Sequence, residues 1–295
     1  MRDKAFASYH PIILFVYFTV TVFITMFTMH PVLLGISFVG SIVFCGTLIG
    51  VKELFKSLAY SVPILIIIAL TNPLFSHNGE TILFFLNDNP VTAEAICYGV
   101  AIAVMIISMY YWFKCYHAVM TSDKFVFLFG RFLPKLALLL SMTLGFVPKL
   151  KKRYREINEA QKAMGIYTSK SYVDRIRSKV RVMSILLTWS LENSVDTADS
   201  MRARGYGLKG RSSYAIYRWH RQDTVMACIA FALSAGVIWL MFSGYGDYNF
   251  YPTLAKIDVS ALAFTLYAGL FILMFLSTVI EIKENLLWRY LRSKI

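Results

Sequence analysis

The sequence predicts an all-α polytopic membrane protein with about six transmembrane helices and long amphipathic helices outside the lipid. Three observations carry this prediction: 57% of the 295 residues are hydrophobic, only 16% are charged, and the net charge is nevertheless +13. Soluble domains are about a quarter charged, so this chain has too little polar surface to cover a water-soluble body of its size. Because charges are unfavourable in lipid, the cations must gather outside it.

Six apolar runs define the predicted spans. Each run is close to the roughly 20 residues that an α-helix needs to cross a hydrocarbon layer about 30 Å thick. None of them contains Asp, Glu, Lys or Arg. The runs are Pro11–Met29, Pro31–Gly50, Ser57–Ser76, Ala95–Phe113, Val225–Tyr245 and Val259–Ile280.

The distribution of Lys and Arg predicts the orientation. Between Lys114 and Arg221 the chain holds 21 of its 30 basic residues and seven acids, so this segment alone carries +14. If the spans alternate, the loop Asn72–Glu94, which has no Lys or Arg, and the segment Gly244–Asp258 lie on the opposite side. The excess of cations in cytoplasmic loops then predicts that both termini and the middle segment are cytoplasmic.

The middle segment is predicted to be helical and to divide the chain into three parts: spans one to four in residues 1–120, a cytoplasmic segment in 121–222, and the last two spans with a cytoplasmic C-terminus in 223–295. Within it, Phe125–Val147 has apolar residues at helical spacing and contains two cations and a proline, which favours an amphipathic helix at the membrane surface.

Two charged helices are predicted after Pro148. The first is the run Lys149–Lys162 and the second extends from about Tyr172 to Met201. The apolar face of the second helix consists of Val180, Met183, Leu187, Leu191 and Val195. Its solvent-facing side consists of Arg175, Arg177, Lys179, Glu192 and Asp199.

Both charged helices end in a similar phrase. The two endings are Lys162-Ala163-Met164-Gly165 and Arg202-Ala203-Arg204-Gly205. A glycine after the last turn, with cations in that turn, is typical of ordinary helix capping. The repetition of the pattern also fits a paired docking surface, because an arginine presents a fixed fork of donors to a partner's carboxylate.

Several other functions find little support in the sequence. The four cysteines and five histidines show no metal-ligand spacing. Gly205–Ser212 fits a phosphate loop only if Arg211 replaces lysine, and it follows an amphipathic helix where a buried strand is needed.

Cations beside membrane spans bind anionic lipids more commonly than nucleic acid. A stand-alone secondary transporter and a membrane-embedded enzyme are the alternatives, but the spans lack mid-membrane charges and no catalytic motif is present.

Small residues within the spans predict close helix packing. Gly46 with Gly50, and Ala230 with Ser234, are small-xxx-small pairs that let helices approach each other. Either pair is suited to a partner protein or to another helix of this chain.

Two ordered sets of residues carry a resemblance to a known family. The first set is Asn72-Pro73-Leu74-Phe75, His77, Gly79, Thr81, Leu83-Phe84, Asn89-Pro90, Thr92, Glu94-Ala95 and Tyr98-Gly99. The second set is Thr121, Leu133-Pro134, Phe146, Pro148, Ala160-Gln161 and Ala203-Arg204-Gly205. In this order, on a background of six spans, they resemble the transmembrane T component of energy-coupling factor (ECF) transporters, bacterial and archaeal importers of vitamins and metal ions.

The resemblance implies a non-catalytic scaffold in a prokaryotic cell membrane, with no catalytic, cofactor or metal site of its own. T components carry two long cytoplasmic coupling helices whose Ala-Arg-Gly-type ends dock in grooves on two ABC-type ATPase subunits, which bind the ATP. Their membrane part holds a small substrate-binding S component that topples in the bilayer as ATP is consumed. Membrane lipids are further expected partners, and nucleic acid is not.

Carried over to this sequence, the docking motif is complete at one helix end only. Ala203, Arg204 and Gly205 match it in full, whereas Met164 stands where an arginine is expected between Ala163 and Gly165. Gly145 also replaces an expected arginine. The second ATPase contact is therefore expected to rest on Lys162 or on apolar packing by Met164, which suits two non-identical ATPase subunits.

Overall fold

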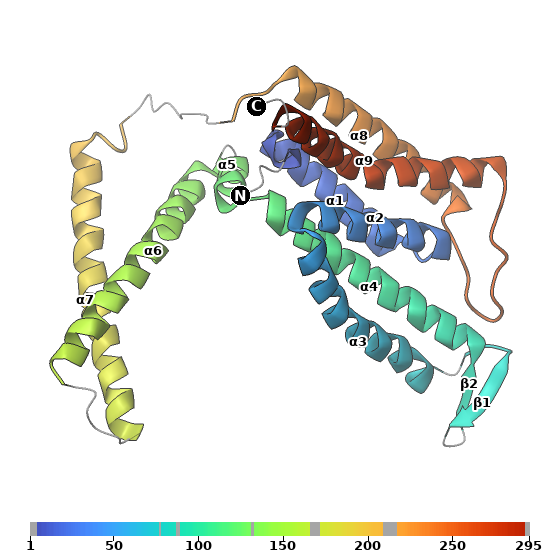
Figure 1. The fold of residues 1–295 in the computed structure, drawn as a ribbon, viewed down its shortest axis with the longest axis horizontal. Helices are drawn as coiled ribbons and strands as arrows, with labels where there is room; N and C mark the ends of the chain where they lie inside the picture. The colour runs from blue at the N-terminus through green and yellow to red at the C-terminus, as the bar shows by residue number, and fades with distance from the viewer. Residues whose placement is uncertain are drawn as a thin grey trace. The chain divides into compact units, whose positions relative to one another are not determined.

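The computed structural model describes residues 5–76, 78–86, 89–130, 133–165, 172–208 and 217–292. Its elements are almost all helical (Figure 1). In chain order they are η1 (Phe6–Ser8), α1 (Pro11–Phe27), α2 (Pro31–Ile49), α3 (Val51–Phe75), β1 (Ile82–Leu86), β2 (Asn89–Thr92), α4 (Ala93–Val119), α5 (Ser122–Gly130), α6 (Pro134–Ala163), α7 (Tyr172–Ala203), α8 (Arg221–Leu240), η2 (Met241–Tyr245) and α9 (Ala261–Arg292).

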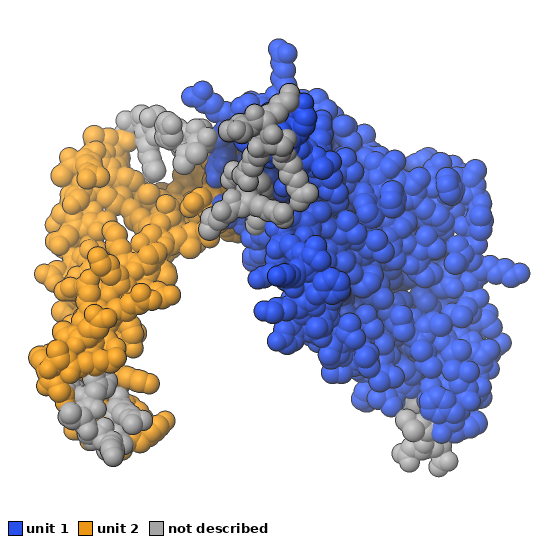
Figure 2. Space-filling model, in the orientation of Figure 1, with its two compact units in different colours: residues 1–121, 217–295 blue, residues 122–216 orange. Residues whose placement is uncertain are grey.

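The chain forms two compact units, which Figure 2 shows in different colours. Unit 1 combines residues 1–121 with residues 217–295, and unit 2 consists of residues 122–216. Unit 1 therefore contains both the first and the third of the three predicted segments, joined into one bundle. Unit 2 contains α5, α6 and α7.

The prediction of an all-α polytopic membrane protein is confirmed. In the described residues, five helices are long and apolar enough to cross a membrane: α2, α3, α4, α8 extended by η2, and α9. The remaining predicted span, which is the first in chain order, is α1. Its 17 residues are about 26 Å long at ~1.5 Å per residue, near the lower limit for a span. Helices α3, α4 and α9 all continue beyond the apolar runs that predict them.

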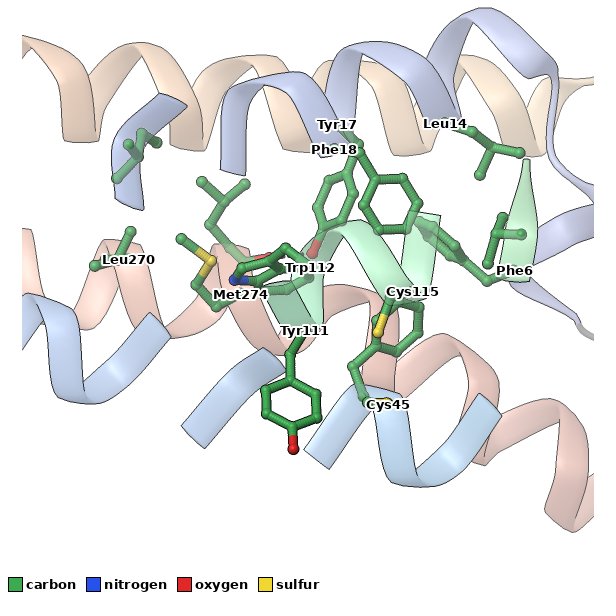
Figure 3. Packing of buried hydrophobic residues seen from close by; sticks show 14 of the residues in the cluster. Phe6, Leu14, Tyr17, Phe18, Cys45, Tyr111, Trp112, Cys115, Leu270 and Met274 are labelled. Atoms are coloured by element: carbon green, nitrogen blue, oxygen red, sulfur yellow. Dashed lines mark hydrogen bonds between the residues drawn. The ribbon is translucent and has the colours of Figure 1, made fainter. Parts of the chain in front are cut away.

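The core of unit 1 is built from aromatic side chains of η1, α1, α2 and α4, which pack with leucines and Met274 of α9 (Figure 3). The ring of Phe6 meets the rings of Phe18 and Phe44 edge-on, at centroid distances of 6.1 and 5.6 Å. Trp112 is fully buried and its Nε1 donates a hydrogen bond to Ser37 Oγ at 3.1 Å. Such edge-on contacts and satisfied polar atoms make these rings favourable to bury.

Two buried carboxylates hold the start of the chain against its last two helices. Glu281 of α9 accepts a hydrogen bond from the backbone N–H of Phe6 at 2.9 Å. Asp223 of α8 accepts from the backbone N–H groups of His10 at 3.0 Å and His220 at 2.8 Å. Hydrogen bonds to ionised acceptors are stronger than neutral ones. The N-terminal segment is thus fixed by the first turn of α8 and the later turns of α9.

Helices α3 and α4 pack closely where Gly99 of α4 lies against a backbone carbonyl of α3 that Pro73 leaves without its helical donor. Pro73 lies inside α3 and has no N–H to donate to the carbonyl oxygen of Ala69. Gly99 of α4 lies against that carbonyl so closely that a Cβ atom at this position would overlap the Ala69 oxygen. Asn72 adds a hydrogen bond from its side-chain nitrogen to the Ala95 carbonyl oxygen at 2.8 Å.

The two small-residue pairs serve contacts within this chain. A Cβ atom added at Gly46 would lie 3.0 Å from Leu54 of the next helix, and Gly50 ends α2 with a φ of +96°. Ala230 packs against the core and Ser234 is buried. Of the two roles that the sequence leaves open, internal packing is the one that the contacts support.

The segment between α3 and α4 contains a β-hairpin that the sequence analysis treats as a loop. Strands β1 and β2 pair in antiparallel register, with Phe84 opposite Val91 and Phe85 opposite Pro90, and a register shift lies between Ile82 and Phe84. The run of Ile, Leu and Phe contains residues that favour strands, and it could have indicated the first strand. The second strand is hard to predict because it contains Asn89-Pro90, and proline is uncommon in strands outside edges and bulges.

The predicted helix Phe125–Val147 is wrong in its boundaries. Helix α5 ends at Gly130 and α6 begins at Pro134, whereas Arg131 and Phe132 lie outside the described residues. Glycine just after a helix and proline in its first turn are the usual stop and start signals. Pro148, expected to separate two helices, lies inside α6. Helix α6 continues through it because a single lost hydrogen bond on an exposed helix does not outweigh the turns on either side.

Candidate functional site

The two predicted docking ends have the same backbone geometry. Gly165 follows α6 with a φ of +71°, and Gly205 follows α7 with a φ of +75°. Left-handed φ angles favour glycine because it has no Cβ. In both cases the glycine N–H donates to the carbonyl oxygen three residues earlier, at 3.0 Å to Lys162 and at 2.9 Å to Arg202. The prediction that both helices terminate at a glycine cap is confirmed.

The end of α7 forms a Schellman motif, a two-hydrogen-bond helix terminus. Besides the Gly205 bond, the N–H of Tyr206 donates to the carbonyl oxygen of Met201 at 3.0 Å. This pairing satisfies carbonyl groups that a helix end otherwise leaves unpaired. The residue directly before the glycine is Arg204, whose side chain is exposed.

The end of α6 presents Met164 in the position that Arg204 has in α7. The N–H of Met164 donates to the carbonyl oxygen of Ala160 at 3.0 Å, and its side chain is exposed. Ala163, Gly165 and Lys162 are exposed as well. In the described residues the two ends share the glycine geometry, and the side chain directly before the glycine differs between them.

The cations near the α7 end differ in their pairing. Arg202 Nη1 lies 3.9 Å from Asp199 Oδ1, and both side chains are mostly exposed, so this pair contributes little to stability. Arg204 has no ion pair with any residue that the structure describes. In this respect Arg204 differs from Arg202.

The two ends lie on opposite sides of the point where α6 and α7 cross (Figure 1). Helix α7 starts shortly after α6 ends and is about 48 Å long at ~1.5 Å per residue. Its own end is consequently far from the end of α6. The two ends are therefore too far apart to form one continuous surface.

The crossing is held by a small aromatic cluster, of which Phe146 belongs to the family-like residues and Trp189 does not. The rings of Phe146 and Trp189 are stacked, with centroids 5.9 Å apart and an interplanar angle of 2°. The guanidinium of Arg153 lies over the Trp189 ring, 5.6 Å from its centroid. Arg153 also forms a salt bridge with Glu156 at 3.0 Å. An aromatic residue among the polar residues of α7 is the signal that could have identified Trp189.

The predicted apolar face of α7 is not buried. Five of its residues are more than half exposed: Val180, Met183, Leu187, Leu191 and Val195. Among the side chains of α7 that the structure describes, Ser178 and Val182 are buried, and they occupy a different face. A contiguous row of exposed apolar side chains on a surface helix usually marks an interaction site.

The family-like residues between α3 and α4 come together in one hydrogen-bond network. The backbone N–H of Thr81 donates to Glu94 Oε1 at 3.3 Å, and Thr92 Oγ1 donates to the Asn78 carbonyl oxygen at 2.7 Å. Gly79, with a φ of +128°, lies against Thr92 and Glu94 where a Cβ would not fit. His77 lies outside the described residues. These residues shape the hairpin.

The phosphate-loop-like segment is described only in its first part. Gly205–Leu208 forms the turn that follows α7, and residues 209–216, including Arg211, lie outside the described residues. A helix precedes this turn where a phosphate loop has a strand.

Comparisons with known proteins give one family and several relatives. The CbiQ family, described as cobalt transport protein, matches residues 9–214. An energy-coupling factor transporter transmembrane protein EcfT from Listeria innocua is 37% identical over 108 residues, which cover 36% of this chain and 41% of the relative. EcfT 1 of Listeria monocytogenes is 33% identical over 110 residues, or 37% of this chain and 41% of the relative.

A third relative shows the same extent of similarity. EcfT of Bacillus subtilis is 32% identical over 108 residues, covering 36% of this chain and 41% of the relative. The chain thus spans about two-fifths of the length of these curated relatives.

Proposed function

The chain belongs to the CbiQ family of cobalt transport proteins, and on this premise we propose that it is the T component of an ECF-type importer. In this role it couples ATP hydrolysis by two cytoplasmic ATPase subunits to the movement of a membrane-embedded S component that carries a vitamin or a metal ion. The chain itself has a non-catalytic role, and the ATP belongs to the partner subunits.

The observation that carries the proposal is the pair of capped helix ends in unit 2. Each end places one exposed side chain directly before a glycine with positive φ, on a backbone whose terminal hydrogen bonds are already made. A rigid, self-satisfied end is suited to insertion into a groove because little order must be gained on binding. The separation of the ends fits two ATPase subunits.

The two ends are proposed to bind with different chemistry. Arg204 offers a planar set of donors to a carboxylate, and a desolvated pair of this kind typically costs about 2–5 kcal/mol when one side is removed. Met164 offers a flexible apolar side chain that fills irregular grooves, and its loss costs roughly 1–2 kcal/mol. The α7 end is thus the stronger anchor, and Lys162 supplies the cation nearest to the weaker one.

Unit 2 is proposed to lie in the cytoplasm together with both termini. The support is the cluster of 21 basic residues, against seven acids, between Lys114 and Arg221, which is typical of the cytoplasmic side of a prokaryotic cell membrane. The exposed apolar row on α7 supports a chain that works within a complex, since such a row is unfavourable in water.

The test is copurification of the ATPase subunits with variants expressed at equal levels in the membrane. Arg204→Ala should lose most of the ATPases and of substrate uptake, and Met164→Ala should lose a smaller part. Arg181→Ala is the matched control, because Arg181 is an exposed cation on the same helix, away from its end.

Three results would count against the proposal. Full retention of the ATPases by Arg204→Ala would remove the docking role. Equal losses for Arg204→Ala and Met164→Ala would remove the asymmetry. A loss with Arg181→Ala as large as that with Arg204→Ala would show that general positive charge, and not the helix end, binds the ATPases.

A further inference from the structure

The outer strand of the β-hairpin presents apolar side chains that nothing in the described chain covers. Ile82, Leu83, Phe84 and Phe85 are consecutive and each is more than half exposed. Consecutive residues of a strand point to opposite faces. Beyond the register shift, Phe84 and Phe85 pair regularly with Val91 and Pro90, so these two rings lie on opposite faces of the hairpin.

The second strand is the one that packs on the bundle. Val91 and Thr92 are buried, whereas Phe84, which faces the same side as Val91, is 52% exposed. Phe85, on the opposite face, is 65% exposed. The hairpin therefore has apolar surface on two faces, which a single flat partner surface cannot cover.

The hairpin continues an apolar surface that already belongs to the membrane. Helix α3 is one of the membrane-spanning candidates, with few of its residues buried. Its last turns expose Leu70, Leu74 and Phe75. The hairpin follows these turns after a short connection, so its exposed side chains come next in the chain after the lipid-facing end of α3.

The length of α3 determines how deep the hairpin lies in the bilayer. Lys56 is the last charged residue of this helix, and charged groups remain outside the hydrocarbon layer. The stretch from Lys56 to Phe75 is about 29 Å long at ~1.5 Å per residue, close to the ~30 Å thickness of that layer. Phe75 therefore lies at the opposite boundary, and the hairpin lies there too.

A position deeper in the lipid is excluded by the strand edge. A two-stranded hairpin leaves one row of backbone groups of β1 without a strand partner, and hydrocarbon does not satisfy such groups. Exposed Glu80, two residues before the start of β1, also requires water or headgroups. Phe and Leu side chains form the apolar faces of helices that lie in the headgroup region, and the same region solvates polar backbone.

We propose that the hairpin β1–β2 is a membrane-interface anchor whose two faces are covered by lipid at the boundary between headgroups and hydrocarbon. Phe84 and Phe85 insert on either side of the strand, and the free edge of β1 faces headgroups and water. The proposal depends on the membrane location of the chain and is independent of its role as a T component.

The experiment uses the full chain in phosphatidylcholine nanodiscs with one spin label at a time. Exposed Cys97 and Cys228 are replaced by serine, and labels are placed at F84C and F85C. I67C on the exposed middle of α3 is the lipid control, and E80C is the water control. Collision rates with oxygen and with a water-soluble nickel chelate are measured by power saturation.

Both hairpin labels should collide several-fold less with the nickel chelate than the label at position 80 does. Their ratio of oxygen to nickel collisions should lie between those at positions 67 and 80, as expected for a boundary depth. Labels at I82C and L83C should repeat the result, which covers the case in which a label at position 84 or 85 disturbs the hairpin.

Two outcomes would overturn the proposal. Nickel collisions at both positions equal to those at position 80 would place the hairpin in water. A lipid signal at one position together with exclusion of both reagents at the other would show that protein, such as a second copy of this chain, covers one face.

Discussion

The two units bury their side chains to very different extents. Unit 1 closes around fully buried rings, among them Phe6, Trp112 and Tyr111, and supplies hydrogen-bond partners for their polar atoms. Unit 2 buries few side chains along α6 and α7 and leaves most of its apolar residues exposed. The difference indicates that unit 1 is stabilised by its own packing, whereas the described part of unit 2 leaves most of its apolar surface uncovered.

The largest test of this comparison removes one tryptophan from each unit. Trp112→Ala should lower the free energy of unfolding by about 3–5 kcal/mol, because it opens a cavity and leaves Ser37 without its donor. Trp189→Ala, which removes a partly exposed ring stacked on Phe146, should lose about 1 kcal/mol. Thermal unfolding in detergent compares the two, and equal losses would contradict the assignment of the core to unit 1.

A second pair of variants should give opposite signs. Gly99→Ala places a Cβ against the Ala69 carbonyl in the tight α3–α4 contact and should destabilise by about 1–3 kcal/mol. Gly145→Ala lies in exposed α6 with no atom near the added Cβ, and should stabilise by roughly 0.5–1 kcal/mol because alanine favours helices. Thermal unfolding in detergent measures the stability of both variants. A loss of stability in Gly145→Ala would show that unit 2 has hidden tight contacts.

A third test concerns the carboxylate that holds the N-terminal segment. Asp223→Ala removes the acceptor of the His10 and His220 backbone N–H groups and should destabilise unit 1 by about 1–3 kcal/mol. Asp247→Ala, at an exposed position, should change stability by less than about 0.5 kcal/mol. Protection of the first residues against proteolysis should fall in the first variant only.

The smallest expected effect is a pH dependence from His30, which lies between α1 and α2. Its Nε2 is 3.1 Å from the Tyr267 hydroxyl, which donates to the Asp258 carbonyl oxygen. Burial lowers the pKa of His30, partly opposed by the negative charge of Asp258. The unfolded chain then binds the proton more readily, so stability should be full above pH ~6.5 and fall as the pH decreases below it.

His30→Gln should flatten part of this slope. Burial also lowers the pKa of His10, with Asp223 opposing it, so the remaining slope should disappear only when His10 is replaced as well. Melting temperatures between pH 5 and 7.5 provide the measurement. An unchanged slope in the double variant would exclude both histidines as its source.

The sequence predicts the membrane architecture well because hydropathy depends on composition alone. Runs such as Pro31–Gly50 need no tertiary information to be recognised as spans, and α2 covers nearly the same residues. The glycine-capped ends at Gly165 and Gly205 are equally local, because capping uses only neighbouring residues. These features can therefore be predicted without knowledge of the fold.

The features that the sequence does not reveal depend on contacts between distant residues. Nothing near Glu281 indicates that it binds the N–H of Phe6. The apolar face of α7 follows the helical period, but the period does not say whether a face is covered, and here it is exposed. Pro148 leads to a wrong helix boundary in the prediction, because it lies inside α6. A proline in the sequence shows that one backbone N–H donor is missing, but it does not show whether the neighbouring turns of the helix tolerate the loss.

The anchoring of the N-terminal turn to the last helices has a consequence for biogenesis. Ribosomes deliver α1 first, but the amide of Phe6 and the hydroxyl of Tyr17 meet their acceptors, Glu281 and the Leu273 carbonyl, only after α9 has been synthesised. The bundle cannot close during translation of its first helices. Until α9 arrives, those polar groups remain without these partners, and a nascent chain arrested before α9 should be recognised by membrane proteases as incomplete.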